Sequence, residues 1–447
     1  MKIFFVSLGC DKNSVDSEKM LSLLSDRGYE FTDDEDDADI AIVNSCCFIN
    51  DAKEESIENI IRLGQRRLSG QLKALVVTGC LSQRYNLDIH KELPEVDALL
   101  GTNSIGEIAN VLDSVIGGKG YDVLRSIDER PFDGTGRILT TGGHYEYLKI
   151  AEGCNKKCTY CIIPKIRGSY RSYEMEKLID EALDLAGRGV KELVLVAQET
   201  TLYGIDLYGK KMLPELVRRL CGIEGIEWIR LLYCYPEEIT DELIDVIKNE
   251  PKVVHYIDMP VQSGSDRILG LMGRKTDRKQ ILGIIKKLRD NIPDICIRTT
   301  LIAGFPGEKK ADHEETLAFI KEAEFNRLGC FKYSAEEGTV AEKMDHQTSE
   351  RTKKSRLNDI MLAQQKIAFR HNDTLKNEIV SAFVEGYIRE DDIYVCRTYM
   401  DAPGVDGLLF VTSDKELESG RIIKARILGY NDYDLIGEYI DQDEFTK

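Results

Sequence analysis

The sequence predicts an α/β protein of three domains, and three observations lead to this prediction. Short apolar runs alternate with helical patterns over residues 1–138, which indicates an open, doubly wound parallel α/β domain. The alternation resumes over residues 139–375, which indicates a partial or full TIM-type barrel. Residues 376–447 hold five short strand-like runs separated by turn residues, which is typical of a small antiparallel β-barrel.

The first domain places three cysteines at the ends of its strands. Its buried parallel strands are expected at Ile3–Leu8, Asp39–Val43 and Ala74–Val77. They lead into Cys10, Cys46 and Cys80, and the carboxyl ends of parallel strands share one edge, so the three thiols should converge. Three thiolates suit an iron–sulfur cluster with one open iron. The alternative is that each cysteine simply packs as a small apolar residue at the end of a buried strand. Cys47 follows Cys46, and only one of two successive residues should reach a cluster.

The central domain is expected to carry its chemistry at the carboxyl ends of six strands. These strands are predicted at Tyr147–Ala151, Glu192–Val196, Ile229–Tyr233, His255–Met259, Cys296–Ile302 and Leu328–Tyr333. Polar residues follow several of them: Gln198, Glu199, Gln262, Ser263, Arg298 to Thr300, and the run Ala303–Glu308. Together these residues are typical of the surface on which a cofactor lies in its binding site. Any one of them alone is also consistent with a turn or with a structural hydrogen bond. A long charged helix, Glu350–His371, should cross to the tail.

A second set of cysteines lies just after the first strand of the central domain. Cys154, Cys158 and Cys161 have the spacing C-x3-C-x2-C, and the closest histidine, His144, lies ahead of the strand. A tetrahedral zinc site and a closed iron–sulfur cube each need four ligands, so three thiolates leave one iron open to a small molecule. The spacing resembles the radical S-adenosylmethionine (radical SAM) signature. The alternative is a zinc knuckle or three unrelated thiols.

Composition limits the classes to which the protein can belong. The chain has 447 residues, of which 42% are hydrophobic and 31% charged, and no apolar run is long enough to span a bilayer. The start, MKIFFVSLGC, reads as a buried strand rather than a signal peptide. Twelve cysteines without a secretory signal indicate a reducing cytoplasm. The sequence has no P-loop, G-x-G-x-x-G or HExxH motif, so a nucleotide kinase or a zinc hydrolase has no support.

The charge of the chain favours a basic partner. The net charge is −18, and residues 377–447 hold 16 acidic and seven basic residues, a difference of −9. Proteins that bind nucleic acid through its phosphates usually present a basic surface, so we expect no stable nucleic-acid binding. The tail is expected to dock a basic protein, and the alternative is a merely solvated acidic surface.

Together these features resemble the methylthiotransferases over essentially the whole chain. These are radical SAM enzymes with an auxiliary 4Fe-4S cluster and a terminal TRAM domain, and they insert a methylthio group at an unactivated C–H bond. The runs VSLGCDKNSVDSE, IVNSCCFINDAKEESIE, VVTGCLSQRY, LVAQETTLYG and RTYMDAPGVDGLLFV are similar to the branch that modifies an aspartate of ribosomal protein S-twelve at its β-carbon. The run MPVQSGSDRIL, around Gln262, is closer to the branch that modifies isopentenylated adenosine in tRNA.

The resemblance implies the cofactors and their ligands. It implies a SAM-cleaving 4Fe-4S cluster on Cys154, Cys158 and Cys161, and it places the auxiliary 4Fe-4S cluster on Cys10, Cys46 and Cys80. Two SAM molecules would be used per turnover, with Gln198 and Arg298 as the expected SAM contacts. A basic ribosomal protein would be the substrate, a flavodoxin or ferredoxin type of protein the electron donor, and no membrane would be involved. The alternatives are the tRNA-modifying activity and a non-enzymatic iron–sulfur redox or scaffold protein.

Overall fold

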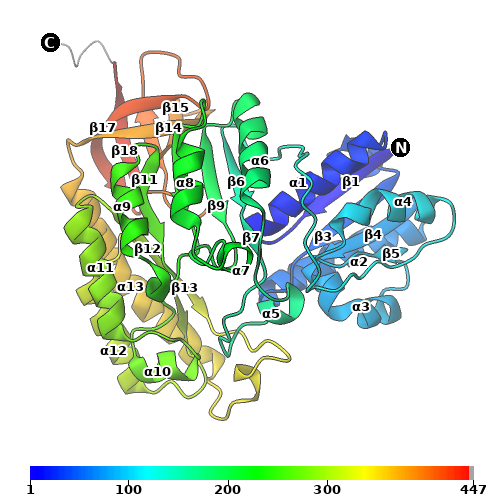
Figure 1. Cartoon of the computed structure of the whole chain (residues 1–447), viewed down its shortest axis with the longest axis horizontal. Coiled ribbons are helices and arrows are strands. Elements are labelled where there is room, and N and C mark those ends of the chain that lie inside the picture. Colours follow the sequence, from blue (N-terminus) through cyan, green and yellow to red (C-terminus); the bar gives the residue numbers. More distant parts are fainter. Residues whose placement is uncertain (442–447) are drawn as a thin grey trace.

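The first domain is built on a parallel sheet with helices on both faces. The computed structural model describes residues 1–441 and is shown in Figure 1. The sheet has the strand order β2-β1-β3-β4-β5. Its strands are β1 (Lys2–Ser7), β2 (Glu30–Thr32), β3 (Ile40–Ser45), β4 (Ala74–Gly79) and β5 (Ala98–Leu99). The three expected strands lie within two residues of their predicted positions, whereas β2 and β5 are too short for an apolar pattern to reveal.

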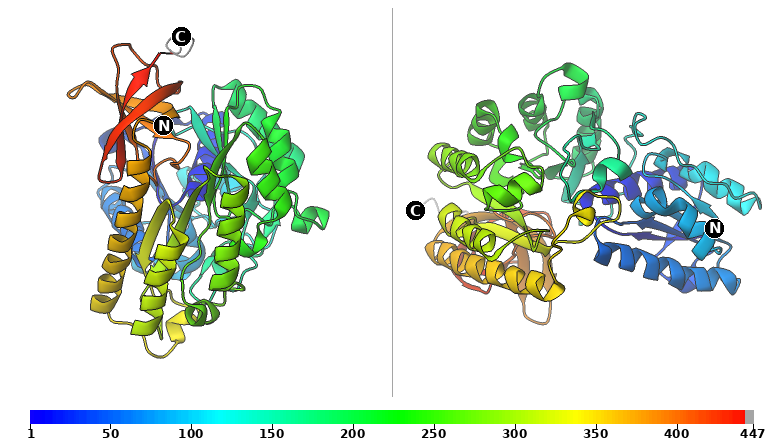
Figure 2. Two further views of the ribbon diagram at one scale, coloured as in Figure 1. Left: turned by 90° about the vertical axis from the view of Figure 1, so that its left-hand side faces the viewer. Right: turned by 90° about the horizontal axis from the view of Figure 1, so that it is seen from below.

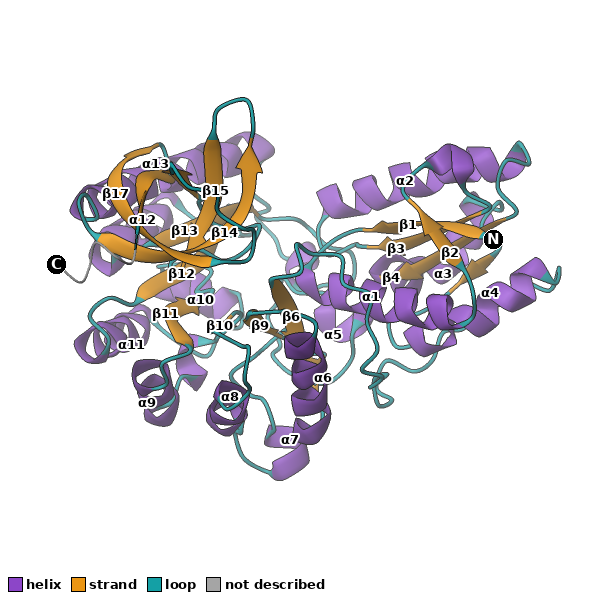
Figure 3. Ribbon diagram, turned by 90° about the horizontal axis from the view of Figure 1, so that it is seen from above, coloured by secondary structure: helices purple, strands orange, loops and turns teal. Residues whose placement is uncertain are grey.

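The helices of this domain cover the sheet in pairs. They are α1 (Asp11–Asp26), α2 (Asn50–Leu68), α3 (Cys80–Glu92) and α4 (Ile108–Ile116). Apolar residues of α1 and α4 share one core with the sheet, and those of α2 and α3 share the other, so both faces are buried (Figure 3). This confirms the doubly wound prediction, because a parallel sheet needs cover on both faces.

The central domain is an open, partial barrel of six parallel strands in the order β13-β12-β11-β10-β9-β6. The strands are β6 (Tyr145–Lys149), β9 (Glu192–Val196), β10 (Trp228–Leu231), β11 (Val253–Asp258), β12 (Cys296–Ala303) and β13 (Arg327–Lys332). A short ribbon pairs β7 (Ala151–Glu152) with β8 (Arg171–Ser172). The helices are α5 (Ile163–Ile166), α6 (Met175–Gly187), α7 (Ile205–Tyr208), α8 (Leu213–Cys221), α9 (Asp241–Asn249), α10 (Asp266–Leu271), α11 (Arg278–Asn291) and α12 (Lys310–Ala323).

The tail forms a closed five-stranded barrel, reached through the long helix α13 (Glu350–Thr374). Its strands are β14 (Ile379–Ile388), β15 (Ile393–Thr398), β16 (Leu409–Thr412), β17 (Ile422–Asn431) and β18 (Asp434–Ile440). Most neighbouring strands are antiparallel, as predicted, but β16 and β18 pair in parallel to close the barrel. Closure removes the exposed edges that a sheet of this size would otherwise present.

The tail barrel packs against the inner face of the central barrel. Along β9, every second side chain packs against the helices outside the barrel, and the side chains between them pack against the tail inside it. Trp228 of β10 contacts Phe383 of β14, with ring centroids 4.6 Å apart. Buried ion pairs reinforce the contact: Arg397 with Glu192 at 2.5 Å and Arg327 with Asp401 at 2.7 Å. Part of the acidic excess of the tail is therefore used inside the molecule rather than on its surface.

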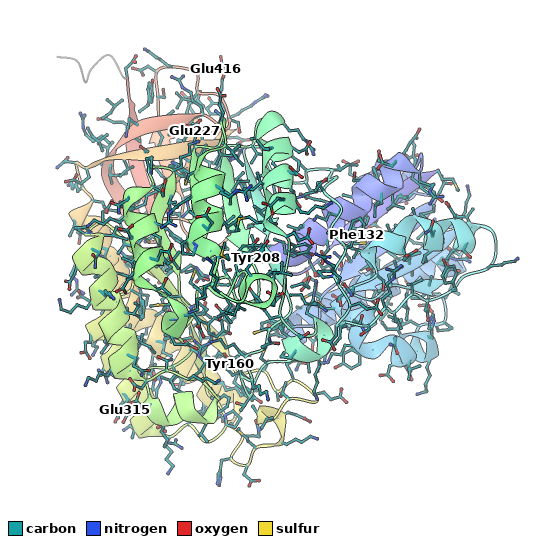
Figure 4. The ribbon with its side chains drawn as sticks, viewed as in Figure 1. Phe132, Tyr160, Tyr208, Glu227, Glu315 and Glu416 are labelled. Carbon is teal, nitrogen blue, oxygen red and sulfur yellow. The ribbon has the colours of Figure 1, made fainter. Side chains whose placement is uncertain are left out.

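The first domain bridges the open side of the central barrel. At one end, α1 lies against β6, and at the other the loop after β13 reaches the first domain, where Arg84 donates to Glu336 at 2.9 Å (Figure 2). The connecting segment 117–144 has no helix or strand, and its Phe132 packs on the core of the first domain (Figure 4). The domain limits at 138 and 375 stay a prediction. Within residues 1–441 no helix is long and apolar enough to cross a membrane.

A buried cluster of charges joins α1 to the central domain. Arg137, almost fully buried, donates to Glu18 of α1 at 2.5 Å, to Glu146 of β6 at 2.7 Å and to Glu181 of α6 at 3.1 Å. Glu181 also accepts from Lys19 at 3.1 Å. Desolvation, partly offset by Arg137 and reinforced by Glu18, raises the pKa of Glu146 to about 7. These charges tolerate burial only while every partner is present.

We therefore predict that Arg137→Met lowers the free energy of unfolding by about 3 to 5 kcal/mol, because it leaves Glu18 and Glu146 buried without their cation and leaves Glu181 with Lys19 alone. Urea unfolding followed by circular dichroism measures the effect. Arg218, on the surface beside Glu242, is the matched control, and Arg218→Met should cost less than about 1 kcal/mol. Equal losses in the two variants would contradict the prediction.

Candidate functional site

Cys10, Cys46 and Cys80 meet at the carboxyl edge of the first sheet, where β1, β3 and β4 end. The chain passes so close there that a Cβ at Gly9 would lie 2.9 Å from the Cys46 Sγ, and the φ of Gly9 is +95°, which favours glycine. Burial and the neighbouring thiols of Cys80 and Cys10 raise the pKa of Cys46 to about 12. Burial also raises the pKa of Cys80. The expected convergence of the three cysteines is thus present.

Cys47 has a different environment from Cys46. It is fully buried among apolar residues of the core beneath α2 and α3, and its carbonyl oxygen accepts a hydrogen bond from Arg84 at 3.1 Å. Cys80 belongs to the same core, and burial together with the nearby Cys80 thiol raises the pKa of Cys47, so the choice of Cys46 rather than Cys47 stays a prediction.

Cys154, Cys158 and Cys161 lie on the loop after β7, at the carboxyl end of the central barrel. The loop is held by the segment after α10, because Thr159 donates through its amide to the Met272 carbonyl at 2.9 Å. Tyr160, inside the cysteine motif, lies at this end of the barrel in Figure 4, opposite the end covered by the tail. Burial, with neighbouring Cys158, raises the pKa of Cys154 to about 11 and that of Cys161 to about 12.

Both sets consist of free cysteine thiols, which are the ligands that iron–sulfur cubes use. Among residues 1–441, no group of three or more His, Cys, Asp or Glu side chains could hold one metal ion. In a cube each thiolate binds its own iron, so the sulfurs stand farther apart than around a single ion. Because burial raises the pKa of Cys46, Cys80, Cys154 and Cys161, binding of a cluster must release the protons of these thiols.

The two cysteine sites are physically interlocked. The segment that follows Cys161 enters the first domain, where Ile162 and Ile166 pack in the core beneath α2 and α3. The Ile166 carbonyl also accepts from Thr102 Oγ1 at 2.9 Å. The carboxyl ends of the two sheets are therefore held against one another.

Gln198 and Glu199 follow the carboxyl end of β9. The Gln198 amide donates to Glu152 at 2.8 Å, while its Oε1 is buried without a partner among the described residues. Glu199 accepts from Thr201, and its Oε2 likewise has no partner there. Burial raises the pKa of Glu199 to about 8, so this carboxyl is largely protonated near neutral pH in the free protein.

Arg298 has a structural role at the interface between the central barrel and the tail barrel. Its guanidinium donates to Asp258 of β11 at 2.8 Å and to Asp406 of the tail at 3.2 Å. Its expected contact with SAM stays a prediction. Thr299, the next residue, donates to the Met259 carbonyl at 2.8 Å, which joins β12 to the end of β11.

The remaining sequence candidates make local contacts at strand ends. Ser263 Oγ accepts from the Ser265 amide at 3.2 Å, and Glu308 accepts from the amides of Gly304 and Phe305, which closes the Ala303–Glu308 turn. Gln262 has a φ of +73° without being glycine, a strained backbone of the kind that occurs at functional sites.

Two groups of polar residues at this site escape sequence reasoning. Arg274, 7% exposed, stacks 4.2 Å from the centroid of the Tyr235 ring, and its Nε and Nη1 have no partner within residues 1–441. Lys12 lies 3.3 Å over the ring of Tyr233, whose hydroxyl donates to Asp11 at 3.0 Å. No local sequence pattern predicts that these residues belong to the site, because their partners come from other segments of the chain.

Glu199 gives a prediction for the protein without cofactors. Its folded-state pKa lies above the ordinary 4.5, so between pH 5 and 8 the unfolded chain loses this proton while the folded chain keeps it, and stability falls. Glu199→Gln removes this loss. Its stability advantage over the parent should grow by up to about 3 kcal/mol from pH 5 to pH 8, measured by urea unfolding. An advantage independent of pH would contradict this; Glu227→Gln, at an exposed site, is the control.

Family models match all three parts of the chain. The radical SAM superfamily matches residues 148–320, the uncharacterized protein family UPF0004 matches residues 2–101, and the TRAM domain matches residues 378–440. Solved structures show the fold at low identity. The radical S-adenosylmethionine methyltransferase TsrM from Kitasatospora setae has a TM-score of 0.54 at 13% identity over 74% of each chain. The cobalamin-dependent radical enzyme OxsB has 0.52 at 15%, over 81% of this chain and 56% of its own.

Curated relatives match almost end to end. The protein named ribosomal protein uS12 methylthiotransferase RimO from Lachnoclostridium phytofermentans is 55% identical, over 98% of this chain and 99% of its own. Proteins of the same name from Caldanaerobacter subterraneus and Clostridium botulinum are 49% and 48% identical, over 97% and 100% of this chain and 99% of theirs. At this identity and coverage, the chain belongs to the RimO family of radical SAM methylthiotransferases.

Proposed function

We propose that the protein transfers a methylthio group to the β-carbon of an aspartate in ribosomal protein uS12. The observation that carries the proposal is the end-to-end match to uS12 methylthiotransferases, with both cysteine sets present in this chain. The adjoining carboxyl edges of the two sheets support it, since transfer of a preformed group needs two reactive centres around one substrate carbon.

We assign Cys154, Cys158 and Cys161 to a SAM-cleaving 4Fe-4S cluster, and Cys10, Cys46 and Cys80 to an auxiliary 4Fe-4S cluster. When bound, these cofactors and two molecules of SAM per turnover supply the electron, the hydrogen-abstracting radical, the methyl group and the sulfur. The thiols bind and space the cofactors. No side chain has to act as a general base.

Polar atoms without partners suggest how SAM is held. The unpaired Nε and Nη1 of Arg274 suit a carboxylate, and Cys158 lies close enough to Arg274 to affect its pKa. The free Oε1 of Gln198 suits a hydroxyl or an ammonium group. Ionised Glu199 would balance a positive charge nearby, so SAM binding should be accompanied by loss of its proton.

The rest of the chain excludes water and fixes alignment. The tail barrel covers the inner face of the central barrel, and the first domain covers its open side. A radical intermediate needs this enclosure, because a small misplacement or an entering solvent molecule would divert it.

The tail offers a surface for a basic substrate. Its exposed acidic residues gather in the loops between strands: Glu390, Asp391, Asp392, Asp414, Glu416, Glu418 and Asp432. Figure 4 shows Glu416 at the top of the view, on the tail barrel. Complementary charge would attract a basic ribosomal protein to this barrel, which lies at the end of the molecule opposite the loop of Cys154, Cys158 and Cys161, so the contact would hold a part of the substrate remote from the reacting aspartate. The electron donor, of flavodoxin or ferredoxin type, stays a prediction.

The substrate is tested by offering both candidates. The anaerobically reconstituted, reduced protein is incubated with SAM, sulfide and either ribosomal protein uS12 or bulk tRNA. We expect a mass gain of about 46 Da on an aspartate of the protein, the increment for replacing H by SCH3. The same gain on a tRNA adenosine would overturn the substrate assignment and favour the MPVQSGSDRIL stretch as the better guide. Cleavage of SAM with no gain on either would reject both substrates.

The cluster ligands are tested by iron content. The reconstituted protein should hold about eight iron atoms per chain, and alanine at Cys10, Cys46 and Cys80, or at Cys154, Cys158 and Cys161, should leave about four. Cys47→Ala is the matched control, because Cys47 is buried beside Cys46 but should keep all the iron. Full iron content in either triple variant would refute the assignment for that set.

A further inference from the structure

Arg167 stands between the two cysteine sites. It follows Cys161 by six residues, at the end of the short helix α5, and is 2% exposed. Its Nη2 lies 3.5 Å from the Sγ of Cys80, which belongs to the other cysteine set. One side chain of the radical SAM loop therefore contacts a sulfur of the first domain directly.

Its other contacts hold the guanidinium rigidly in place. Nη1 donates to Asp16 of α1 at 2.8 Å and to Glu152 of β7 at 3.0 Å, and Nη2 also donates to Asn13. The second oxygen of Glu152 accepts from Gln198 at 2.8 Å. A continuous line of contacts thus runs from Cys80 through Arg167 and Glu152 to Gln198.

The charges around Arg167 are balanced without the thiolates. Arg167 and Lys149 together face Asp16 and Glu152, with Lys149 donating to both carboxylates. Three thiolates at Cys10, Cys46 and Cys80 would add negative charge beside this balanced group. Arg167 is the member that reaches a sulfur.

We propose that Arg167 is a positioning residue that fixes Cys80 against the radical SAM site and raises the reduction potential of the auxiliary cluster. The proposal rests on the ligand assignment made above. A hydrogen bond to a ligand sulfur and a nearby positive charge both favour the reduced, more negative form of a cluster. Through Glu152, the same side chain orients Gln198, so that the two cofactor sites share one rigid support.

Arg137 provides a matched control within the same interface. It is equally buried between α1 and the central domain and is paired with three carboxylates, but it contacts no cysteine. Substitutions at Arg137 therefore report the effect of disturbing a buried arginine of this interface, without the contact to sulfur.

The test uses full-length protein in which Cys154, Cys158 and Cys161 are alanine, so that only the auxiliary cluster is loaded. Reconstituted Arg167→Gln should retain its iron and show a reduction potential more negative than the parent, followed by electron paramagnetic resonance during redox titration. Arg167→Lys keeps the charge but loses the fork that reaches sulfur and two carboxylates, so it should give a smaller shift in the same direction. Arg137→Gln and Arg137→Lys should leave the potential at the parent value.

The outcomes separate the inference from the proposed function. Shifts at Arg167 no larger than those at Arg137 would overturn the inference while the ligand assignment stands. If Arg167→Gln does not fold, the reduction potentials of Arg167→Lys and Arg137→Lys are compared in the same way. A parent that binds no iron at Cys10, Cys46 and Cys80 would overturn the ligand assignment and the inference with it.

Discussion

The structure depends on charges buried between α1 and the first strands of the central barrel. Arg137 comes from the connecting segment, Lys149 and Arg167 come from the central domain, and their carboxylates come from both sides of the interface. Burying ions is costly, and the cost is recovered only when each meets its partner at hydrogen-bonding distance. An apolar interface would tolerate sliding, whereas this one admits a single alignment. The relative position of two sets of cysteines, far apart in sequence, follows from that alignment.

The same interface explains why the domains are interlocked rather than merely adjacent. The loop that carries the second cysteine set continues into the hydrophobic core of the first domain through Ile162 and Ile166. Moving one site away from the other would expose these residues and break the contacts of Arg167 at once. The apolar contacts supply most of the free energy that holds the domains together, and the ion pairs fix their relative position. A reaction centred on one carbon between two cofactors needs this kind of rigidity.

Much of this could be predicted from sequence, because the relevant patterns are local. Strand runs such as Glu192–Val196 and the spacing of Cys154, Cys158 and Cys161 are contiguous, and the βα repeat brings Cys10, Cys46 and Cys80 to one edge. The contacts of Arg167 and Arg274 could not be predicted, since their partners lie in distant segments. The fate of the acidic tail shows the same limit: composition counts Glu385, Asp401 and Asp406 as surface charge, whereas they pair with His144, Arg327 and Arg298 of the central domain.

The inward-facing contacts of the tail have a consequence for how the protein is made. A ribosome delivers the chain from its amino end, so the six strands of the central barrel emerge before Asp401, Asp406 and Arg397 exist. Until then Glu192 has only Arg230 of its two arginine partners, Arg327 lacks Asp401, and the apolar face around Trp228 is uncovered. The tail domain, which is made after the barrel, therefore completes the core of the central domain, and the barrel becomes a finished structure only once the tail has also been made.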